Sequence, residues 1–523
     1  MIKIYVPLDT TSVSLGADEV VQEIKQIAIQ NNLDVDIIRN GSWGLFWLET
    51  LVEVEVNGQR IAYGPVQEED VAGLFDANFL NGGEHPLRVG DITQVPYLAK
   101  QTRLCFKRVG LVDPMDIDDY IKHGGFTALN KAFSMSAAEL IKEMEHSGLR
   151  GRGGAAFPSY LKLQATKDAV SVDDEKFVVC NFDEGDSGTF SDRMMGEGDP
   201  FMILEGMFLT ALAVGASEGY IYLRSEYPIA RKVLNNAINL AKKTGWLGKN
   251  VQNSGKDFDI HLRIGAGSYV CGEETALLNS LEGKRGTVRV KPPFPVHKGL
   301  FGKPTALFNV ISLVSMVPII EHGGKAYGKL GYDRSRGTCP FQLSGNIKYG
   351  GLVELPFGIT VRDIIDDFGG GIEFPFDGGR DVKLVQIGGP LGYHMSKDDL
   401  DNPLDYEHFK TLGGHIGHGG IIVMGYDASA KELAHFAFDF CALESCGTCT
   451  PCRIGSRRGA EMMEQVISGE SVNENIILIK ELCDTLTQTS LCALGGITAV
   501  PVLSLIKNFP NEFEDRYNKY VRR

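Results

Sequence analysis

The chain has 523 residues, of which 43% are hydrophobic and 23% charged, as in a globular protein of three or four domains. Its net charge of −15 argues against nucleic-acid binding, and no apolar run reaches the roughly 18 residues of a membrane span. The N-terminus lacks the pattern of a signal peptide, and ten cysteines do not make a disulfide scaffold. We therefore expect a cytoplasmic protein, without direct membrane insertion, whose clustered thiols bind a metal.

Residues 1–80 alternate strand and helix signals and contain a hairpin whose turn is Asn57–Gly58. This βαβ–ββα pattern predicts a small thioredoxin-like domain. Because the first cysteine of the chain is Cys105, such a domain would carry no redox thiols. The stretch LNGGEHPLRVGDITQ, residues 81–95, is expected to be a linker.

The remaining chain divides into three regions. Residues 96–330 are rich in glycine and alternate strands with helices, which predicts an α/β domain with a mostly parallel sheet. Residues 335–425 are rich in strands and glycine turns, and we expect a β-grasp-like (ubiquitin-like) domain there. Residues 426–523 read as a helical bundle with cysteines near its start. The expected fold class is therefore α/β and multidomain.

Three cysteines in one loop form the pattern Cys446-x2-Cys449-x2-Cys452, and Cys492 follows 40 positions later. Three closely spaced thiolates with a distant fourth are typical of a [4Fe–4S] cluster. Structural zinc more often uses two separated CxxC pairs, so zinc is the weaker alternative and unligated thiols the weakest. Cys483 is a rival fourth ligand, but a Gly-Gly pair beside Cys492 favours Cys492.

Three arginines follow the cysteine loop closely: Arg453, Arg457 and Arg458. Their positive charge would offset an anionic cluster, although a solvated helix face explains them equally well. The other cysteines are scattered among apolar neighbours and are interpreted as buried small side chains.

The segment GLRGRGGAAFPSYLK, residues 148–162, fits the G-x-G-x-x-G/A pattern only formally, because helix rather than strand precedes it. Its exposed backbone N–H groups and basic side chains (Arg150, Arg152 and Lys162) still suit a phosphate or a nucleotide. Phe157 could stack on a flat ring. The alternative is a glycine-rich surface turn.

Two further loops follow predicted strands. The acidic loop CNFDEGDSGTF begins at Cys180 and places carboxylates where open α/β sheets bind ligands, which suits hydroxyls of a ribose or ribityl chain. The loop GAGSYVCGEETALL, residues 265–278, brings Glu273 and Glu274 to a helix N-terminus, where carboxylates are stabilised. Capping and solvation are the alternative reading of these acidic side chains.

Two other stretches carry charge or histidine. In the stiff segment KPPFP, Lys291 and Phe294 could clamp a dinucleotide, with a rigid connecting loop as the alternative. The stretch HIGHGG, residues 415–420, is interpreted as a glycine-rich turn rather than as a metal site.

Together these motifs resemble one family closely and in the same order, from about residue 100 to about residue 515. The family is the flavin- and NADH-binding (51 kDa) subunit of the complex I type, which includes diaphorase subunits of NAD-linked hydrogenases and β subunits of soluble molybdenum formate dehydrogenases. The resemblance implies a Rossmann-like domain that binds FMN with NAD(H) stacked on it. It implies FMN contacts from Gly151, Lys162, Asn181, Asp183, Glu184, Tyr269, Gly272, Glu273 and Asn309. It implies NADH contacts from Arg152, Gly153, Phe157, Asp186, Glu274, Lys291 and Phe294.

By the same resemblance, Cys446, Cys449, Cys452 and Cys492 would hold the [4Fe–4S] cluster. Hydride would pass between the nicotinamide and the flavin. The flavin would then pass the electrons one at a time to the cluster. Glu274 would tune nucleotide binding through its charge, and Asp186 would contact the nicotinamide.

The cysteine-free N-terminal extension and the sequence EGDSGTF most resemble the formate dehydrogenase β subunit. The implied partners are a molybdenum and iron–sulfur catalytic subunit and a small [2Fe–2S] subunit. A hydrogenase diaphorase and the NADH-oxidising subunit of complex I are the alternatives. Phe182 and Phe308 depart from the family pattern and favour a third possibility, an electron-transfer scaffold without flavin.

Overall fold

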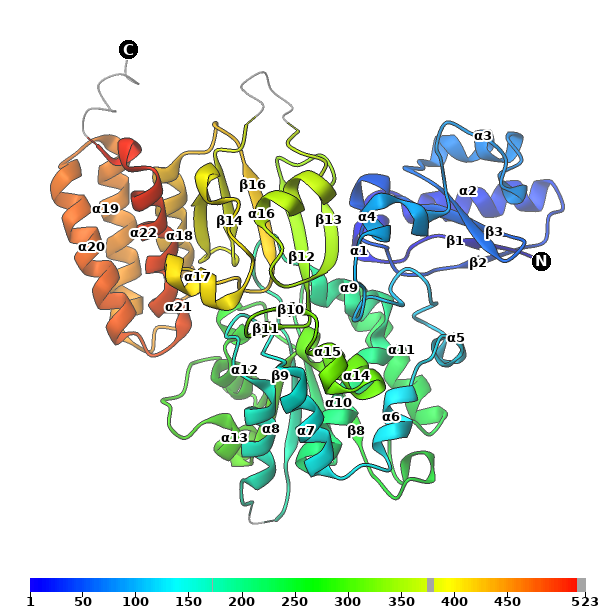
Figure 1. Cartoon of the computed structure of the whole chain (residues 1–523), viewed down its shortest axis with the longest axis horizontal. Helices are drawn as coiled ribbons and strands as arrows, with labels where there is room; N and C mark the ends of the chain where they lie inside the picture. Colours follow the sequence, from blue (N-terminus) through cyan, green and yellow to red (C-terminus); the bar gives the residue numbers. More distant parts are fainter. Residues whose placement is uncertain (172, 374–380, 515–523) are drawn as a thin grey trace.

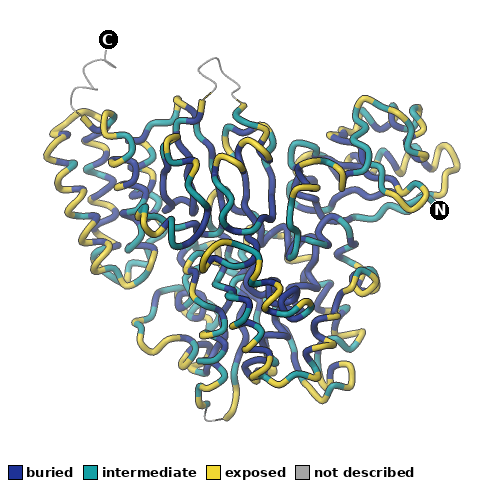
Figure 2. The backbone as a smooth tube through the Cα atoms, viewed as in Figure 1, coloured by how far each residue is buried: buried dark blue, intermediate teal, exposed yellow. Residues whose placement is uncertain are grey.

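The computed structural model describes residues 1–171, 173–373 and 381–514 (Figure 1). Two sheet domains lie at the centre, one above the other, and the N-terminal domain and the C-terminal helices flank the upper one (Figure 1). Buried residues concentrate in the two central sheets and in the helices around the lower one (Figure 2).

The N-terminal domain is a five-stranded sheet with the order β2-β1-β3-β4-β5. Its first two strands are parallel and the other pairs are antiparallel. The elements are β1 (Ile2–Tyr5), α1 (Thr10–Ser14), α2 (Ala17–Gln30), β2 (Val35–Ile38), β3 (Val52–Val56), β4 (Gln59–Tyr63), α3 (Val71–Asp76) and β5 (Arg88–Gly90). Asn57 and Gly58 both have positive φ, as the two-residue hairpin turn requires. The thioredoxin-like description remains an interpretation of this order.

The expected linker at 81–95 is wrong in part. β5 pairs with β4 and extends the N-terminal sheet, although its register is irregular. This strand has only three residues, which is too short for an alternation of polar and apolar side chains to be recognised in the sequence.

The N-terminal domain contacts helix α9 (Ser191–Gly198) through buried polar side chains. Glu197 accepts hydrogen bonds from the backbone N–H and the hydroxyl of Thr10 at 2.9 and 2.6 Å. The Arg193 guanidinium lies 3.0 Å from the Glu197 carboxylate and also donates to Thr11. Buried charge-assisted hydrogen bonds of this kind hold the two domains in one relative position.

The α/β domain contains a four-stranded parallel sheet with the order β8-β7-β6-β9. Its strands are β6 (Phe177–Phe182), β7 (Glu218–Leu223), β8 (Asp259–Ile264) and β9 (Thr305–Asn309). The main helices around it are α7 (Ala137–Ser147), α8 (Ser159–Asp168), α10 (Pro200–Val214), α11 (Pro228–Lys243), α12 (Glu274–Leu281) and α14 (Val310–His322). The chain runs outward from β6 to β8 and then returns to β9 on the other side of β6. Ligands of open α/β sheets bind at such a reversal, beyond the carboxyl ends of the strands.

The upper central domain is a mixed sheet with the order β13-β12-β16-β14-β15. β12 is antiparallel to β13 and parallel to β16, and β14 is antiparallel to both of its neighbours. The elements are β12 (Thr338–Gly345), β13 (Gly351–Pro356), α16 (Val361–Asp363), β14 (Leu384–Ile387), β15 (Tyr393–Ser396), α17 (Tyr406–Leu412) and β16 (Gly420–Met424). We keep β-grasp-like as our interpretation of this order.

The C-terminal region is helical as far as it is described, to residue 514, and residues 515–523 lie outside the description. Its helices are α18 (Ala430–Glu444), α19 (Ser456–Ser468), α20 (Val472–Thr489), α21 (Ala493–Ile497) and α22 (Ala499–Asn508). Across the described residues, no helix combines the length and the apolar character that a bilayer crossing needs.

Candidate functional site: a cavity beside a cysteine loop

A cavity of about 820 Å³ lies at the carboxyl ends of β6 and β9. This volume is in the range of small-molecule and cofactor sites. The cavity is lined by all residues that the sequence assigned to cofactor binding or catalysis, except Arg152. These residues are Gly151, Gly153, Phe157, Lys162, Asn181, Asp183, Glu184, Asp186, Tyr269, Gly272, Glu273, Glu274, Lys291, Phe294 and Asn309. The structure therefore brings four separate loops together at the reversal point of the sheet.

Asp183 supplies an unused hydrogen-bond acceptor to this cavity. Burial raises its pKa to about 7, and the Arg224 guanidinium only partly opposes the rise. Its Oδ2 is buried and accepts no hydrogen bond from the described residues. A buried acceptor without a donor is costly, and a ligand hydroxyl would satisfy it. This observation fits the polyol chain of a flavin nucleotide.

Glu184 and Asp186 are held in different ways. The Glu184 carboxylate accepts the backbone N–H groups of Asp192 and Arg193, at 3.1 and 3.0 Å, at the start of α9. Asp186 accepts a 2.7 Å hydrogen bond from the Tyr269 hydroxyl. Gly185 permits this contact, because a Cβ there would lie 2.5 Å from the Tyr269 ring. The acidic loop is thus rigidly placed along the cavity wall.

Opposite charges alternate along another side of the cavity. Lys291 Nζ lies 3.1 Å from Glu273 and 3.0 Å from Glu274, and Lys162 Nζ lies 3.8 Å from Glu274. Glu273 is also the N-cap of α12, as its position before the helix predicted. The two lysines could meet phosphates, while the carboxylates moderate their charge.

Two aromatic rings stand at the cavity with open faces. Phe157 and Phe294 are each 51% exposed although both line the cavity. A large apolar side chain that is half exposed beside a cavity offers a stacking surface to a planar ring. Their position agrees with the predicted nucleotide contacts, which remain predictions.

Glu274→Gln is expected to tighten dinucleotide binding. The change removes a carboxylate that lies within 4.0 Å of both Lys162 and Lys291, so both cations become freer to meet phosphates. We expect the KM for NADH and the inhibition constant for NAD⁺ to fall by about 3- to 10-fold, as roughly 1 kcal/mol of charge interaction implies.

Steady-state kinetics with a dye acceptor measure both constants. Glu282→Gln is the matched control, because Glu282 pairs with Arg289 and Lys284 and does not line the cavity. Unchanged constants in Glu274→Gln would show that Glu274 does not tune nucleotide binding.

The prediction that Arg152 meets NADH is wrong for its side chain. Arg152 is 2% exposed and is absent from the cavity lining. It donates to three backbone carbonyls and lies within hydrogen-bond distance of the Tyr327 and Tyr406 hydroxyls. The carbonyls at 336 and 338 lead into the mixed sheet, so Arg152 joins the two central domains.

The two aromatic departures from the family pattern have different positions. Phe182 is completely buried in the core of the α/β domain and does not line the cavity. Phe308 does line it, and the Lys162 ammonium lies 5.3 Å from the centre of its ring. Phe182 therefore does not obstruct a flavin, and Phe308 adds an apolar wall without closing the cavity.

Sequence reasoning missed several lining residues. Asp192, His415 and His418 face the cavity, and the histidines come from the turn HIGHGG of the upper domain. The HxxH spacing is visible in the sequence, but its glycine flanks favour a simple turn. Ala493, Leu494 and Ile497 also line the cavity and belong to α21 of the helical region.

The four predicted cluster cysteines share one apolar cluster with Cys441. Cys483 is fully buried in a different cluster among the C-terminal helices, which disfavours it as the fourth ligand. Among the described residues, no three cysteine sulfurs lie within 4.8 Å of one another. Tetrahedral zinc with bonds of about 2.3 Å would bring them closer, so these sulfur positions are not those of a tetrahedral zinc site.

The surroundings shift the pKa values of the predicted ligands in opposite directions. Cys441 Sγ lies 4.0 Å from Cys452 Sγ, and this contact lowers the pKa of Cys452, whereas burial raises the pKa of Cys492 to about 11. A thiolate is the form that binds a metal, so these shifts do not distinguish iron from zinc. Arg453 donates to the carbonyl of Gly447 and fixes the loop, whereas Arg457 and Arg458 are exposed and pair with Glu461. The solvated-face reading therefore holds for the last two arginines.

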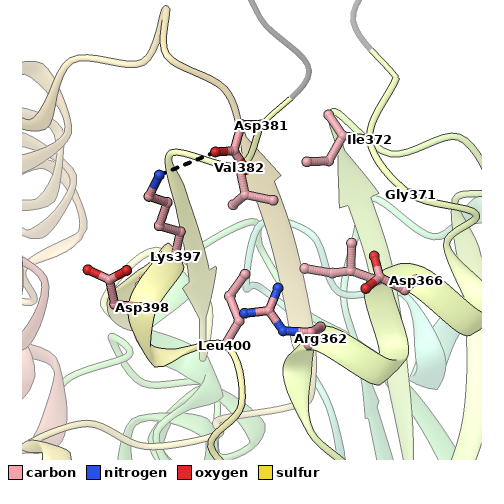
Figure 3. A pocket seen from close by; sticks show the side chains of 10 residues that line it. Arg362, Asp366, Gly371, Ile372, Asp381, Val382, Lys397, Asp398 and Leu400 are labelled. Atoms are coloured by element: carbon pink, nitrogen blue, oxygen red, sulfur yellow. Dashed lines mark hydrogen bonds and ion pairs between the residues drawn. The ribbon is translucent and has the colours of Figure 1, made fainter.

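A second hollow of about 430 Å³ lies on the upper domain (Figure 3). Lys397 pairs there with Asp381 at 3.3 Å (Figure 3). Arg362, which also lines the hollow, pairs with Asp401 outside the lining. No predicted site residue lines it. Its charged side chains are exposed, and it carries no functional assignment.

The fold and this site define a flavin- and iron–sulfur-containing oxidoreductase subunit. The sequence profile of the Nuo51 FMN-binding domain matches residues 144–317, and that of the NADH-ubiquinone oxidoreductase-F iron–sulfur binding region matches residues 432–516. The chain is 42% identical to the NADP-reducing hydrogenase subunit HndC of Solidesulfovibrio fructosivorans, over 79% of this chain and 83% of that one. It is 37% identical to the mitochondrial NADH-ubiquinone oxidoreductase 51 kDa subunit of Neurospora crassa, over 78% and 83%.

The chain therefore belongs to the family of the complex I 51 kDa flavoprotein subunit. A chain of an NAD⁺-reducing [NiFe]-hydrogenase, solved by crystallography in its H₂-reduced state, has a similar fold, with a TM-score of 0.68 and 25% identity over 98% of this chain and 84% of that one. Family membership makes FMN, a [4Fe–4S] cluster and NAD(H) the cofactors of this chain.

Proposed function

We propose that this chain is the diaphorase subunit of a larger enzyme, where it exchanges electrons between NAD(H) and an iron–sulfur chain. Bound FMN supplies the conversion between two-electron hydride transfer and one-electron transfer. The protein binds and orients the two nucleotides, excludes water and holds the charges around them. No side chain needs to act as a nucleophile.

One observation carries this proposal: the cavity and the cysteine loop are neighbours. Ala493 and Leu494, which directly follow Cys492, line the cavity. The Tyr269 ring, also at the cavity, lies 4.8 Å from the ring of Phe440 in the apolar cluster that contains the cysteines. With FMN in this cavity and the cluster on the cysteine loop, as we propose, the two-electron site and the one-electron site would be neighbours.

The residues of the cavity receive these proposed roles. Gly151 and Gly153 let backbone approach the phosphates, and Lys162 and Lys291 supply positive charge. Asp183 and its neighbours bind the polyol chain. The nucleotide rings are fixed by Phe157, Asp186, Tyr269 and Phe294, and Glu274 tunes nucleotide binding through its charge. Cys446, Cys449, Cys452 and Cys492 are the proposed cluster ligands.

For the partner, we propose the catalytic subunit of a cytoplasmic molybdenum formate dehydrogenase together with a small [2Fe–2S] subunit. The N-terminal domain without cysteines and the sequence EGDSGTF support it. A hydrogenase partner is the second candidate, supported by the relative named as a hydrogenase subunit and by the similar hydrogenase chain, whose match includes 98% of this chain.

The test is a visible spectrum of the protein purified anaerobically with its natural partners. Flavin and iron–sulfur bands that bleach with NADH support the diaphorase function. Bleaching with formate as well identifies the formate dehydrogenase, whereas bleaching with H₂ identifies the hydrogenase. The absence of a flavin band would overturn the proposal in favour of an electron-transfer scaffold.

A further inference from the structure

Three buried ionisable side chains meet at the cavity wall. His418 Nε2 lies 3.1 Å from Asp192 Oδ1 and 4.0 Å from Glu184 Oε1. The Glu184 and Asp192 side chains are at most 1% exposed, and that of His418 is 11% exposed. We call Glu184, Asp192 and His418 the acid–histidine triad. All three line the cavity that holds the nucleotides.

The triad is assembled across two domains by a positioning glutamine. Gln342 donates to the carbonyl of His418 at 2.8 Å, and its amide oxygen accepts the backbone N–H groups of Phe190 and Ser191, where α9 begins. Asn309 donates to the other oxygen of Asp192 at 2.7 Å. The position of His418 relative to the carboxylates is therefore built into the fold.

His418 is the only basic side chain of the described residues within 4.0 Å of the Glu184 or Asp192 carboxylate oxygens. Arg193 directs its guanidinium to Glu197, and Arg224 donates to the Glu184 carbonyl rather than to its carboxylate. Tyr227 donates its hydroxyl to the Glu184 carboxylate, and Asp186 adds another negative charge nearby.

These surroundings keep the imidazole charged. Burial lowers the pKa of His418, but Asp192, Glu184 and Asp186 outweigh it and raise the pKa to about 9. Burial, with repulsion from Asp192, raises the pKa of Glu184 to about 7. His415, in the same turn, has its pKa lowered by burial and is neutral. A single positive charge thus faces the cavity from this turn.

We propose that the acid–histidine triad sets the midpoint potential of the flavin, with His418 as the positively charged member that stabilises reduced FMN. This rests on the proposed function. Hydride brings two electrons and one proton, so the bound flavin gains one negative charge. A fixed imidazolium at the cavity wall favours that charge in a low-dielectric site, and the carboxylates hold its proton.

Another reading of the same three groups is a divalent-metal site, since their ligand atoms lie within 4.8 Å of one another. The contacts favour the proton. Both oxygens of Glu184 already accept backbone N–H groups, and His418 Nε2 lies 3.1 Å from Asp192 Oδ1 as an ion pair. Metal ligation would need the Glu184 hydrogen bonds to open and the ion pair to separate.

The experiment is an anaerobic spectroelectrochemical titration of FMN in the enzyme with its natural partners. In His418→Gln, we expect the ratio of the affinities for reduced and oxidised FMN to fall about tenfold, which corresponds to about 30 mV for a two-electron couple. The difference from the native enzyme should shrink as the pH rises past about 9 and the native imidazole loses its charge. His415→Gln is the matched control, and its potential should stay near the native value.

The native enzyme provides a second measurement that needs no variant. Between about pH 9 and 10 the slope of its midpoint potential against pH should rise by about half, because a tenfold coupling moves the pKa of His418 up by about one unit when the flavin is reduced, so that reduction also draws part of a proton onto His418. An unchanged slope, an unchanged potential in His418→Gln, or stoichiometric bound zinc that this variant loses would overturn the proposal. Failure of the diaphorase function is distinguishable, because NADH would then not bleach the native flavin at all.

Discussion

Cys492→Ser is expected to remove the iron–sulfur cluster and leave the flavin in place. Cys492 is the N-cap of α21 and lies in the same apolar cluster as the other three cysteines, so we expect its thiolate to complete the set of four ligands. Changes outside the ligand set of a metal site already cost about 10- to 100-fold, so losing a ligand should cost electron transfer to the partner more than about 100-fold. Iron analysis and the electron paramagnetic resonance spectrum of the reduced protein measure the loss directly.

The matched control is Cys483→Ser. Cys483 was the rival ligand by sequence, but it is fully buried among the C-terminal helices and belongs to another cluster. This variant should keep its iron and its spectrum. NADH-dependent reduction of a two-electron dye should survive in both variants, because the cavity is unchanged. Iron loss in Cys483→Ser with retention in Cys492→Ser would reverse the assignment.

The sequence predicts local structure in this chain better than it predicts the meeting of distant loops. The Asn57–Gly58 turn and the N-terminal position of Glu273 on its helix depend on a few neighbouring residues, and both are confirmed. The place of β9 beside β6 depends on contacts between residues more than 120 positions apart. The hydrophobic periodicity of a sequence carries no information about such long-range contacts. The position of the reversal point of the sheet is therefore known only from the structure.

The two side chains that sequence reasoning misjudged show the same limit. Gly151 and Gly153 line the cavity, whereas Arg152 between them sends its side chain into the domain junction. A glycine-rich motif reveals where backbone can approach a ligand but not where the intervening side chain points. His418 is 226 positions from Asp192, and only the packing of two domains gives it a charged role.

Arg152→Met is expected to destabilise the protein strongly with little effect on nucleotide affinity. The change leaves the carbonyls of residues 150, 336 and 338 without their guanidinium donor in a buried place. Each buried polar group that loses its partner costs about 1–3 kcal/mol, so we expect a loss of about 3–5 kcal/mol. Denaturant unfolding followed by tryptophan fluorescence measures the shift of the midpoint, and dye-linked kinetics of the folded fraction measure the KM for NADH.

Lys291→Met separates this structural role from nucleotide binding. Lys291 lines the cavity and pairs only with Glu273 and Glu274 among the described residues. Its replacement should raise the KM for NADH with a smaller loss of stability, because an ion pair that solvent reaches contributes about 1 kcal/mol or less. If Arg152→Met instead raised the KM as Lys291→Met does and unfolded at the native midpoint, Arg152 would belong to the nucleotide site. A lower unfolding midpoint with an unchanged KM in Arg152→Met would show that a residue inside the glycine motif holds the two central domains together. The motif would then support the cavity wall without contacting the nucleotide through this side chain.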